Sequence, residues 1–295
     1  MSGAGGGEAG SPTTSPARPI ALVTGASAGI GREFATQLAR GGYDLVLVAR
    51  DEGRLRALAG ELRERFGAAS EVLTADLSRD DDTARVVARI DAAPVDLVVN
   101  NAGFGTRGTL ASTPREPQEA MLRVHVLAVH RLAQAAVQQM VPRGRGAIIN
   151  VSSVASFITS PGNVNYCATK AWQRIYSEAL SQELAGRGVY VQALCPGFTH
   201  SEFHARGRMD KTRYPGWWWM PAERVVAVSL AALARRAPVV VIPGTGYRLA
   251  AFLLRHLPLG LRLRLAGRYR RDRPAGPPRE PAPVTSGHDG DRGAQ

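Results

Sequence analysis

The sequence of 295 residues predicts an α/β fold, namely a single Rossmann-like, doubly wound parallel sheet of about seven strands with helices on both faces. Two observations predict this fold. Short apolar runs alternate with longer stretches of helical spacing, and a glycine-rich turn follows the first run. No Pro-, Gly- or Ser-rich break interrupts the alternation between Ile20 and Ile242, so one domain is expected rather than two. The hydrophobic fraction of 44% is sufficient for a sizeable buried core.

The predicted strands are rich in Val, Ile and Leu, and each is bounded by Gly, Pro, Asp or Asn. Continuous apolar runs of this length suit strands that are buried on both faces of a parallel sheet. The stretches between them, such as the one containing Leu55, Leu58 and Leu62, have helical spacing and predict right-handed crossover helices. The predicted strands are Ile20–Val23, Leu45–Val48, Glu71–Thr74, Val95–Val99, Ala147–Val151, Val189–Leu194 and Val239–Ile242.

The two ends of the chain differ in composition from its body. Residues 1–18 are mostly Gly, Ser, Pro, Ala and Thr, and we expect a disordered segment that lacks the apolar core of a secretory signal. The Rossmann domain is expected to span residues 19–245. Residues 246–270 combine leucines with arginines and predict a basic amphipathic helical segment, and residues 271–295 predict a disordered tail.

The charge and the cysteines limit the possible function classes. The formal net charge of +12 comes almost wholly from arginine, and eight arginines but only one acid lie between Arg248 and Arg273. Because the body of the chain is nearly balanced, a nucleic-acid-binding face is not expected. Cys167 and Cys195 provide neither a disulfide framework nor a metal-ligand cluster. We therefore expect no metal site and a reducing, cytoplasmic setting.

The glycine-rich turn Thr24–Gly31 stands between the first strand and the first helix. Glycines in such a turn allow a tight bend, a close approach of a pyrophosphate to the backbone, and close helix–strand packing. The helix N-terminus then offers N–H groups and a partial positive charge to phosphates. The turn therefore predicts a dinucleotide site, since its position in a strand–helix series is specific where a lone glycine-rich turn is not.

The Gly-x3-Gly-x-Gly spacing of this turn resembles the short-chain dehydrogenase/reductase family, and the resemblance covers about residues 20–242. Asn100-Asn101-Ala102-Gly103 resembles the family's Asn-Asn-Ala-Gly motif. Asp76-Leu77 and Pro196-Gly197 resemble its adenine-contacting pair and its nicotinamide-pocket pair. The resemblance implies the cofactor contacts Gly25, Ser27, Gly29, Ile30, Gly31, Arg50, Asp76, Leu77, Asn101, Ala102, Gly103, Tyr166, Lys170, Pro196, Gly197, Thr199 and Ser201.

The end of the second strand favours NADP(H) over NAD(H). NAD-preferring enzymes carry an acid here that binds the ribose 2′-OH, and Ala49 stands at that position. Arg50 follows it and is able to bind a 2′-phosphate in a bidentate manner. Asp51 is the alternative acid, but its position favours a cap of the following helix. Ala28 stands where some NADP-preferring relatives carry a basic residue, so one supporting contact is missing.

Tyr166 and Lys170 are the predicted catalytic pair, since a spacing of four residues puts both side chains on one helix face. A free phenol has a pKa near ~10, and a nearby cation favours its ionised form. Such a tyrosine is able to donate a proton to a carbonyl oxygen while hydride arrives at the carbon. Alone, this spacing is more often a surface pair. Lys170 is, however, one of only two lysines in an arginine-rich chain, which favours a chemical role.

Ser153 and His125 complete the predicted site. Ser153, at the end of the fifth strand, corresponds to the family's catalytic serine, whereas strand alternation sends Ser152 to the opposite face. His125 stands where the family has an asparagine whose backbone carbonyl holds a water of the proton relay. His125 could keep that carbonyl contact, join the relay through its ring, or simply pack in the core.

The substrate side is expected between His200 and Met220. This stretch includes Trp217-Trp218-Trp219, and three adjacent tryptophans cannot all face one core. At least one of them is expected to line the substrate entrance, touch a partner or meet a lipid surface, and an apolar pocket favours a hydrophobic or lipid-like ketone. The turn and basic tail after the last strand resemble those of actinobacterial NADP-dependent ketone and 3-oxoacyl reductases of the family. We expect a small-molecule carbonyl or alcohol substrate and a homo-oligomer. The segment 246–270 either lies on an anionic membrane surface or packs on the body or a second subunit.

Two other functions remain open from the sequence. The same residues could run NAD-dependent alcohol oxidation, although Arg50 argues against NAD. A non-catalytic, cofactor-binding sensor or scaffold is the other alternative, and only the substitution at His125 supports it.

Overall fold

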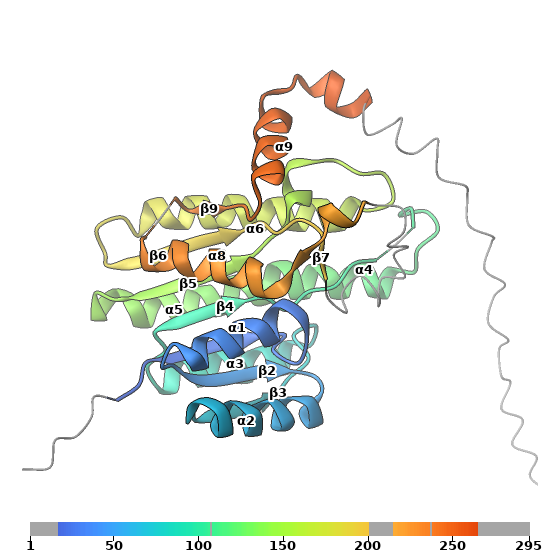
Figure 1. The fold of residues 1–295 in the computed structure, drawn as a ribbon. Coiled ribbons are helices and arrows are strands. Elements are labelled where there is room, and N and C mark those ends of the chain that lie inside the picture. The colour runs from blue at the N-terminus through green and yellow to red at the C-terminus, as the bar shows by residue number, and fades with distance from the viewer. Residues whose placement is uncertain (1–16, 107, 201–214, 237, 265–295) are drawn as a thin grey trace, which may run out of the picture.

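Seven parallel strands form one sheet in the order β3-β2-β1-β4-β5-β6-β9, which confirms the predicted fold (Figure 1). The strands are β1 (Ile20–Thr24), β2 (Asp44–Ala49), β3 (Ser70–Thr74), β4 (Leu97–Asn100), β5 (Gly146–Val151), β6 (Val189–Leu194) and β9 (Val240–Val241). This computed structural model describes residues 17–106, 108–200, 215–236 and 238–264. The chain builds outward from β1 to β3 and then returns to place β4 on the other side of β1. Ligands of open sheets bind at such a reversal, outside the carboxyl ends of the strands.

The sheet separates two apolar cores, because successive side chains of a strand point to opposite faces. Ala21 and Val23 pack into one core with Phe34, whereas Leu22 packs into the other with Ile90. The first core lies beneath α1 (Gly29–Arg40), α2 (Glu52–Phe66) and α8 (Ala222–Ala234). The second lies beneath α3 (Asp80–Ala92), α5 (Val129–Arg143) and α6 (Val164–Glu183).

Polar contacts define where several elements begin. Asp51 caps α2 as predicted, because its carboxylate accepts the N–H of Arg54 at 3.0 Å. The strand predicted from Val95 begins two residues later at Leu97. Instead, the N–H of Val95 donates to the side-chain oxygen of Gln139 at 2.9 Å. The Asp96 carboxylate accepts the N–H of Ile20 at 3.1 Å.

The helix that precedes the site contains a π-helical turn. α4 (Arg115–Leu122) continues through the π-turn η1 (Arg123–Ala128) into α5. A π-turn inserts an extra residue into the helix and often marks a functional site. Its buried members include His125.

Several short elements and helix α9 lie at the carboxyl end of the sheet. A short 3₁₀ helix η2 (Val154–Phe157) follows β5, and β7 (Thr199–His200) pairs with β8 (Met220–Pro221) beside the 3₁₀ turn η4 (Gly216–Trp218). Helix α9 (Thr245–His256) begins one residue before the predicted segment 246–270. Its first turns pack on the loop after β6 and on η2, and the rest of the helix projects from the fold (Figure 1). Across the described ranges, the helices are too short or too polar for a membrane span.

The predicted disordered ends lie almost wholly outside the described residues. Arg18, near the start of the described chain, donates hydrogen bonds to the carbonyls of Ala39, Gly42 and Gly67 at 2.8–3.1 Å. The folded body therefore includes Arg18.

Candidate active site

The glycine turn is locked to β4 by Thr24 and Asn101. The Thr24 hydroxyl accepts the N–H groups of Asn101 (2.9 Å) and Ala102 (3.0 Å), and the Asn101 side-chain amide donates to the Thr24 carbonyl at 2.8 Å. A Cβ on Gly31 would overlap the Gly25 carbonyl and the Asn101 amide, so only glycine fits there. Gly25 has a φ of +66°, which also favours glycine. Three of the predicted cofactor contacts thus interlock at the reversal between β1 and β4.

Helix α1 begins at the end of this turn, at Gly29. Its N-cap is Ala28, and no side chain caps the helix. Its first N–H groups and the positive end of its dipole therefore suit a phosphate group. The donor chemistry fits the pyrophosphate of a dinucleotide.

Arg50 follows β2 at the same edge of the sheet. Its side chain is 70% exposed and lies 3.9 Å from the Asp76 carboxylate. Asp76 in turn accepts the N–H and the hydroxyl of Ser78 at 3.0 and 2.7 Å. Leu77 is buried in the second core, so its side chain supports the loop from beneath.

Tyr166 and Lys170 lie one turn apart near the start of α6, with the Lys170 nitrogen 6.0 Å from the centre of the Tyr166 ring. Burial raises the pKa of Tyr166 to about 12, and the hydrogen bond with Ser153 opposes this rise. Ser153 also accepts the N–H of Ala155 at 3.1 Å. The structure thus brings Ser153, Tyr166 and Lys170 together at the carboxyl ends of the strands.

Lys170 is buried with only 4% of its surface exposed. Its nitrogen donates to the Val151 carbonyl at 2.7 Å and to the Gln173 side-chain oxygen at 2.9 Å. Burial lowers the pKa of Lys170 to about 7, while Cys195 acts in the opposite direction. Desolvation therefore outweighs the expected cation effect, since it favours the neutral forms of both Tyr166 and Lys170.

Ser152 is fixed in a supporting role. Its buried hydroxyl donates to the backbone carbonyl of Lys170 at 2.6 Å. β5 ends at Val151, so both serines lie beyond the strand, and the Ser152 and Ser153 hydroxyls have different partners.

His125 is fully buried in the π-turn, and both ring nitrogens have partners. Nε2 accepts the N–H of Phe104 at 3.1 Å, and Nδ1 lies 2.9 Å from the Thr169 hydroxyl. Burial, followed by the charge of Lys170, holds the pKa of His125 well below its usual value. A neutral histidine with both nitrogens engaged is poorly suited to carry protons.

Gln173 was missed by the sequence reasoning. It is fully buried and joins Lys170 to the backbone carbonyl of His125, to which its amide donates at 3.0 Å. One feature of the sequence could have indicated this role. Gln173 follows Lys170 by three residues, so the two polar side chains share one buried helix face.

Tyr247 was also missed, although it shapes the Pro196-Gly197 loop. Its hydroxyl accepts the N–H of Phe198 at 3.0 Å and donates to the Trp218 carbonyl at 2.7 Å. A Cβ on Gly197 would overlap the Tyr247 ring. Gly197 is thus required by the packing of the C-terminal segment, which no local pattern reveals.

The predicted substrate side is described in part. Trp219 is buried and lies 5.2 Å from the Phe198 ring, whereas Trp218 is 36% exposed and stacks on Phe198 at 6.0 Å. Thr199 is buried, and its hydroxyl donates to the Gly197 carbonyl at 3.1 Å. The predicted contact Ser201 lies outside the described residues, as does the side chain of Trp217.

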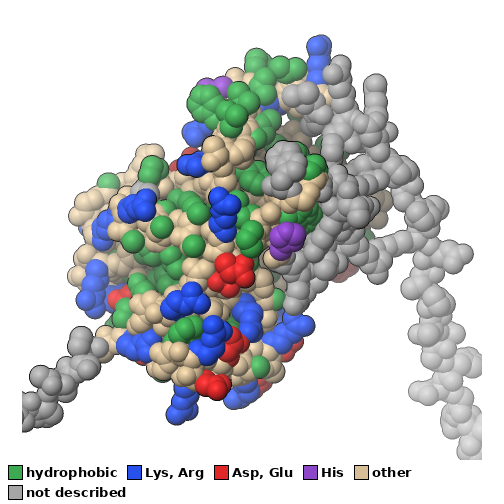
Figure 2. All heavy atoms as spheres, in the orientation of Figure 1, with side chains coloured by type: hydrophobic (Ala, Val, Ile, Leu, Met, Phe, Trp, Pro, Cys, Tyr) green, Lys and Arg blue, Asp and Glu red, His purple; other side chains and the backbone are tan. Residues whose placement is uncertain are grey.

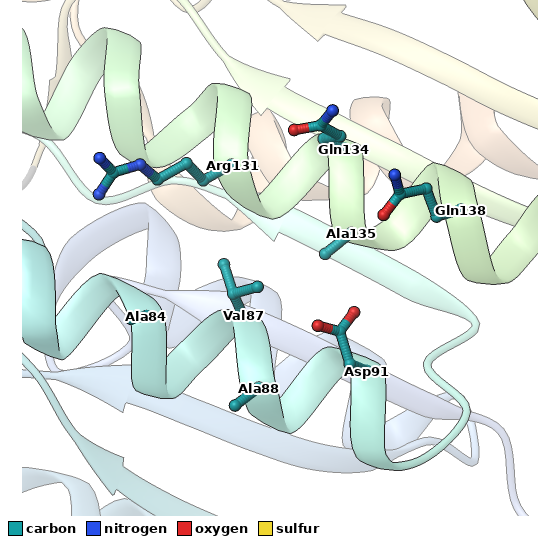
Figure 3. Close-up of a pocket in the computed structure, with 8 residues that line it drawn as sticks. All are labelled: Ala84, Val87, Ala88, Asp91, Arg131, Gln134, Ala135 and Gln138. Carbon is teal, nitrogen blue, oxygen red and sulfur yellow. The ribbon is translucent and has the colours of Figure 1, made fainter.

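A groove elsewhere on the molecule runs along the surface between α3 and α5 (Figure 3). Its floor is made of small apolar side chains, and polar groups such as Asp91 and Gln138 border it. The residues lining it are Ala84, Val87, Ala88, Asp91, Arg131, Gln134, Ala135 and Gln138. It lies between outer helices rather than at the carboxyl ends of the strands, so it is not the site formed by Tyr166 and Lys170.

The fold and this strand-end site define an oxidoreductase of the dinucleotide-binding Rossmann class. The family model described as short chain dehydrogenase matches residues 19–212, so the chain belongs to this family. It is therefore an NAD(P)-dependent oxidoreductase that acts on a small-molecule alcohol or carbonyl.

Three known proteins are informative relatives. A short-chain dehydrogenase from Sphingobium yanoikuyae, solved in complex with NADPH, is 38% identical with a TM-score of 0.74, covering 87% of this chain and 98% of that one. The 7beta-hydroxysteroid dehydrogenase of Collinsella aerofaciens is 34% identical over 60% of this chain and 68% of its own length. The very-long-chain 3-oxoacyl-CoA reductase of Pyrenophora tritici-repentis is 33% identical over 62% of this chain, but the match spans only 55% of that protein.

We expect Gly31→Ala to disrupt the glycine turn, because the new Cβ would overlap two groups that are themselves fixed. Fluorescence titration with NADPH should show at least about tenfold weaker binding, equivalent to ~1.4 kcal/mol. Gly60→Ala is the control. Gly60 is exposed within α2 with open space around its would-be Cβ, so alanine should leave binding unchanged and raise stability slightly. Equal NADPH binding by the two variants would contradict the requirement for glycine at position 31.

Proposed function

We propose that this protein uses NADPH to reduce the ketone of a hydrophobic or lipid-like substrate to a secondary alcohol, with Tyr166 as the proton donor. The proposal rests on the cluster of Ser153, Tyr166 and Lys170 beside the glycine turn. The alcohol and ketone are interconverted by one hydride and one proton, and the bound nicotinamide supplies the hydride.

The residues of the chain would then donate the proton and orient the ketone. The Ser153 hydroxyl hydrogen-bonds the substrate oxygen and orients it toward Tyr166. Because its pKa is raised to about 12, Tyr166 carries its proton at neutral pH and is ready to donate it. The phenolate that remains is stabilised by the ammonium form of Lys170, so proton donation by Tyr166 and protonation of Lys170 favour one another.

The apolar substrate class is supported by side chains near the site. Leu110 and Ile158 are 56% and 41% exposed. They lie in two loops that approach each other at Gly108 and Gly162. Phe198 and Trp218 add aromatic surface on the loop after β6. The steroid and long-chain acyl substrates named for two relatives are of the same apolar class.

The proposed reaction is tested by following NADPH oxidation with a series of ketones of increasing chain length. We expect kcat/KM to rise by up to about fourfold for each methylene group that becomes buried. Tyr166→Phe should lower kcat by about 10²–10⁴-fold, because the proton donor is lost. Tyr43→Phe alters a partly buried tyrosine in the turn before β2 and is the control. Undiminished turnover by Tyr166→Phe, or a preference for small polar ketones, would contradict the respective part of the proposal.

The preference for NADPH is proposed from Ala49 and Arg50. Arg50 is largely exposed and only loosely paired with Asp76, so its guanidinium is available to a 2′-phosphate. We expect Arg50→Ala to raise the KM for NADPH by about 10–100-fold and to leave the KM for NADH unchanged. This factor corresponds to the free energy of one charge-assisted hydrogen bond. Arg56→Ala removes an exposed arginine paired with Glu52 on α2 and is the control. An equal change with both cofactors would exclude 2′-phosphate recognition by Arg50.

We further propose that α9 and the residues after it rest on an anionic lipid surface. Figure 2 shows hydrophobic side chains gathered over α9 at the top of the view. The exposed hydrophobic residues are Leu249, Phe252, Leu253, Leu259, Leu261 and Leu263, with exposed fractions of 44–60%. Arginines are interspersed among them, and residues 238–264 contain no acid. This combination suits an anionic lipid surface better than a neutral one.

A homo-oligomer is proposed through a different face, on η1 and α6. Leu127 and Ile175 are 42% and 55% exposed. Trp172 stacks on Tyr176 there at 4.6 Å. Arg174 lies on another side of α6, over the Phe157 ring at 4.8 Å and paired with Glu178 at 2.6 Å, so it adds no free cation to this apolar face. A second copy of the chain is therefore a better partner here than a lipid surface.

Cosedimentation with vesicles of phosphatidylcholine and phosphatidylglycerol tests the lipid contact. We expect binding that weakens at high salt, and at least about tenfold less binding when Leu249, Phe252 and Leu253 are all changed to serine. Val228→Ser, an exposed apolar position on α8, is the control. Light scattering should give the same mass for the triple variant and the wild type. A smaller mass for the triple variant would assign α9 to the oligomer instead.

A further inference from the structure

The buried amine of Lys170 lacks a carboxylate partner. It forms no ion pair with any described residue, and two neutral oxygens accept its hydrogen bonds. The groups facing it are Tyr166 and Gln173 from α6, His125 from η1, the end of β5, and Cys195 after β6. A buried ammonium in such surroundings depends strongly on each acceptor, because burial of an unpaired charge is costly.

Gln173 holds its amide in one orientation. Its NH₂ donates to the His125 carbonyl at 3.0 Å, so its oxygen accepts from Lys170 at 2.9 Å. The reversed amide would put NH₂ against the lysine donor and oxygen against a carbonyl oxygen. Both contacts would be repulsive, and full burial of Gln173 leaves no water to relieve them.

His125 is fixed in turn by a chain of hydrogen bonds with a single direction. A backbone N–H can only donate, so Nε2 of His125 accepts from Phe104 and Nδ1 carries the proton. Nδ1–H then donates to the Thr169 hydroxyl, which donates to the Tyr166 backbone carbonyl at 3.1 Å. The π-turn is thereby tied both to the loop after β4 and to the catalytic turn of α6.

We propose that Gln173, anchored on the His125 carbonyl, is the positioning residue that holds the ammonium of Lys170 beneath Tyr166. The proposal rests on the proposed function of Tyr166 and Lys170 and adds a residue behind them. Two of the three ammonium protons are taken by Val151 and Gln173. An amide has no acid–base group near neutral pH, so it fixes Lys170 without exchanging protons with it.

The consequences differ for the two informative substitutions. Gln173→Met keeps the size of the side chain but removes the acceptor, which disfavours the ammonium. Gln173→Glu places a carboxylate beside Lys170, which favours it. The ammonium is the active form, so activity is present below the pKa of Lys170 and lost as the pH rises through it. The loss should therefore move to lower pH in Gln173→Met and to higher pH in Gln173→Glu.

A buried glutamine elsewhere provides the matched control. Gln192 on β6 is fully buried and binds the hydroxyl and the carbonyl of Ser229 on α8. Gln192→Met should lower stability as a lost buried hydrogen bond does, but it should leave the pH profile unchanged. We expect Gln173→Met to lower kcat at pH 7.5 by about 10–100-fold, with a smaller effect on the KM for NADPH.

A direct readout avoids any dependence on turnover. The chain has only two lysines, so ¹³Cε-lysine labelling gives two NMR signals, and Lys170→Arg assigns them. The pKa of Lys170, about 7 in the wild type, should fall in Gln173→Met, rise in Gln173→Glu and stay unchanged in Gln192→Met. An unchanged Lys170 pKa in both Gln173 variants would overturn the positioning role. Shifted pKa values in a chain that reduces no ketone would instead overturn the proposed function alone.

Discussion

Both faces of the central sheet are buried beneath helices, and this constraint decides where polar chemistry occurs in the fold. The interiors of β1, β4 and β5 are apolar, and the buried polar side chains of these three strands, Thr24, Asn100 and Asn150, gather at their carboxyl ends. Asn100 donates to Asn150 at 2.9 Å, and Asn150 donates to Ser177 on α6 at the same distance. This ladder fixes the strand ends relative to α6. The turn that carries Tyr166 and Lys170 is positioned by the same contacts that satisfy the buried amides.

Desolvation is the main electrostatic effect in the site, and it acts in opposite directions on its two titrating groups. Burial raises the pKa of Tyr166 to about 12 and lowers that of Lys170 to about 7. Both shifts favour a neutral resting pair. A charged pair becomes favourable only when the phenolate and the ammonium form together, since each then offsets the desolvation of the other. In the proposed mechanism, transfer of the Tyr166 proton and protonation of Lys170 are therefore coupled.

The sequence was sufficient where the physical cause is local. Apolar runs predicted the strands because burial on both faces leaves no polar alternation. The sequence also predicted the glycine turn and the helix face shared by Tyr166 and Lys170, because a bend and a helix face depend on residues that are close in the chain. Strand ends were less predictable. Val95 is apolar, yet a side chain from α5 takes its N–H, and β9 has two residues instead of the four expected.

The residues that were missed depend on contacts between distant segments. Gln173 acquires its role only because the π-turn, 48 residues earlier, presents the His125 carbonyl to it. Tyr247 reaches the loop at Phe198, 49 residues away. The sequence left three possibilities for His125, and the hydrogen bonds to both ring nitrogens argue against the proton carrier among them.

Tyr247 also gives the C-terminal segment a physical connection to the site. It lies in the first turn of α9, and its ring leaves room only for glycine at position 197. Its hydroxyl joins the backbone at Phe198 to that at Trp218, so the loop after β6 and the tryptophan turn are held by one side chain. The exposed leucines of α9 begin two residues further on. A surface that receives α9 would therefore also contact the loop predicted to line the nicotinamide pocket. The proposed apolar substrate and the proposed lipid contact would then lie at the same end of the sheet.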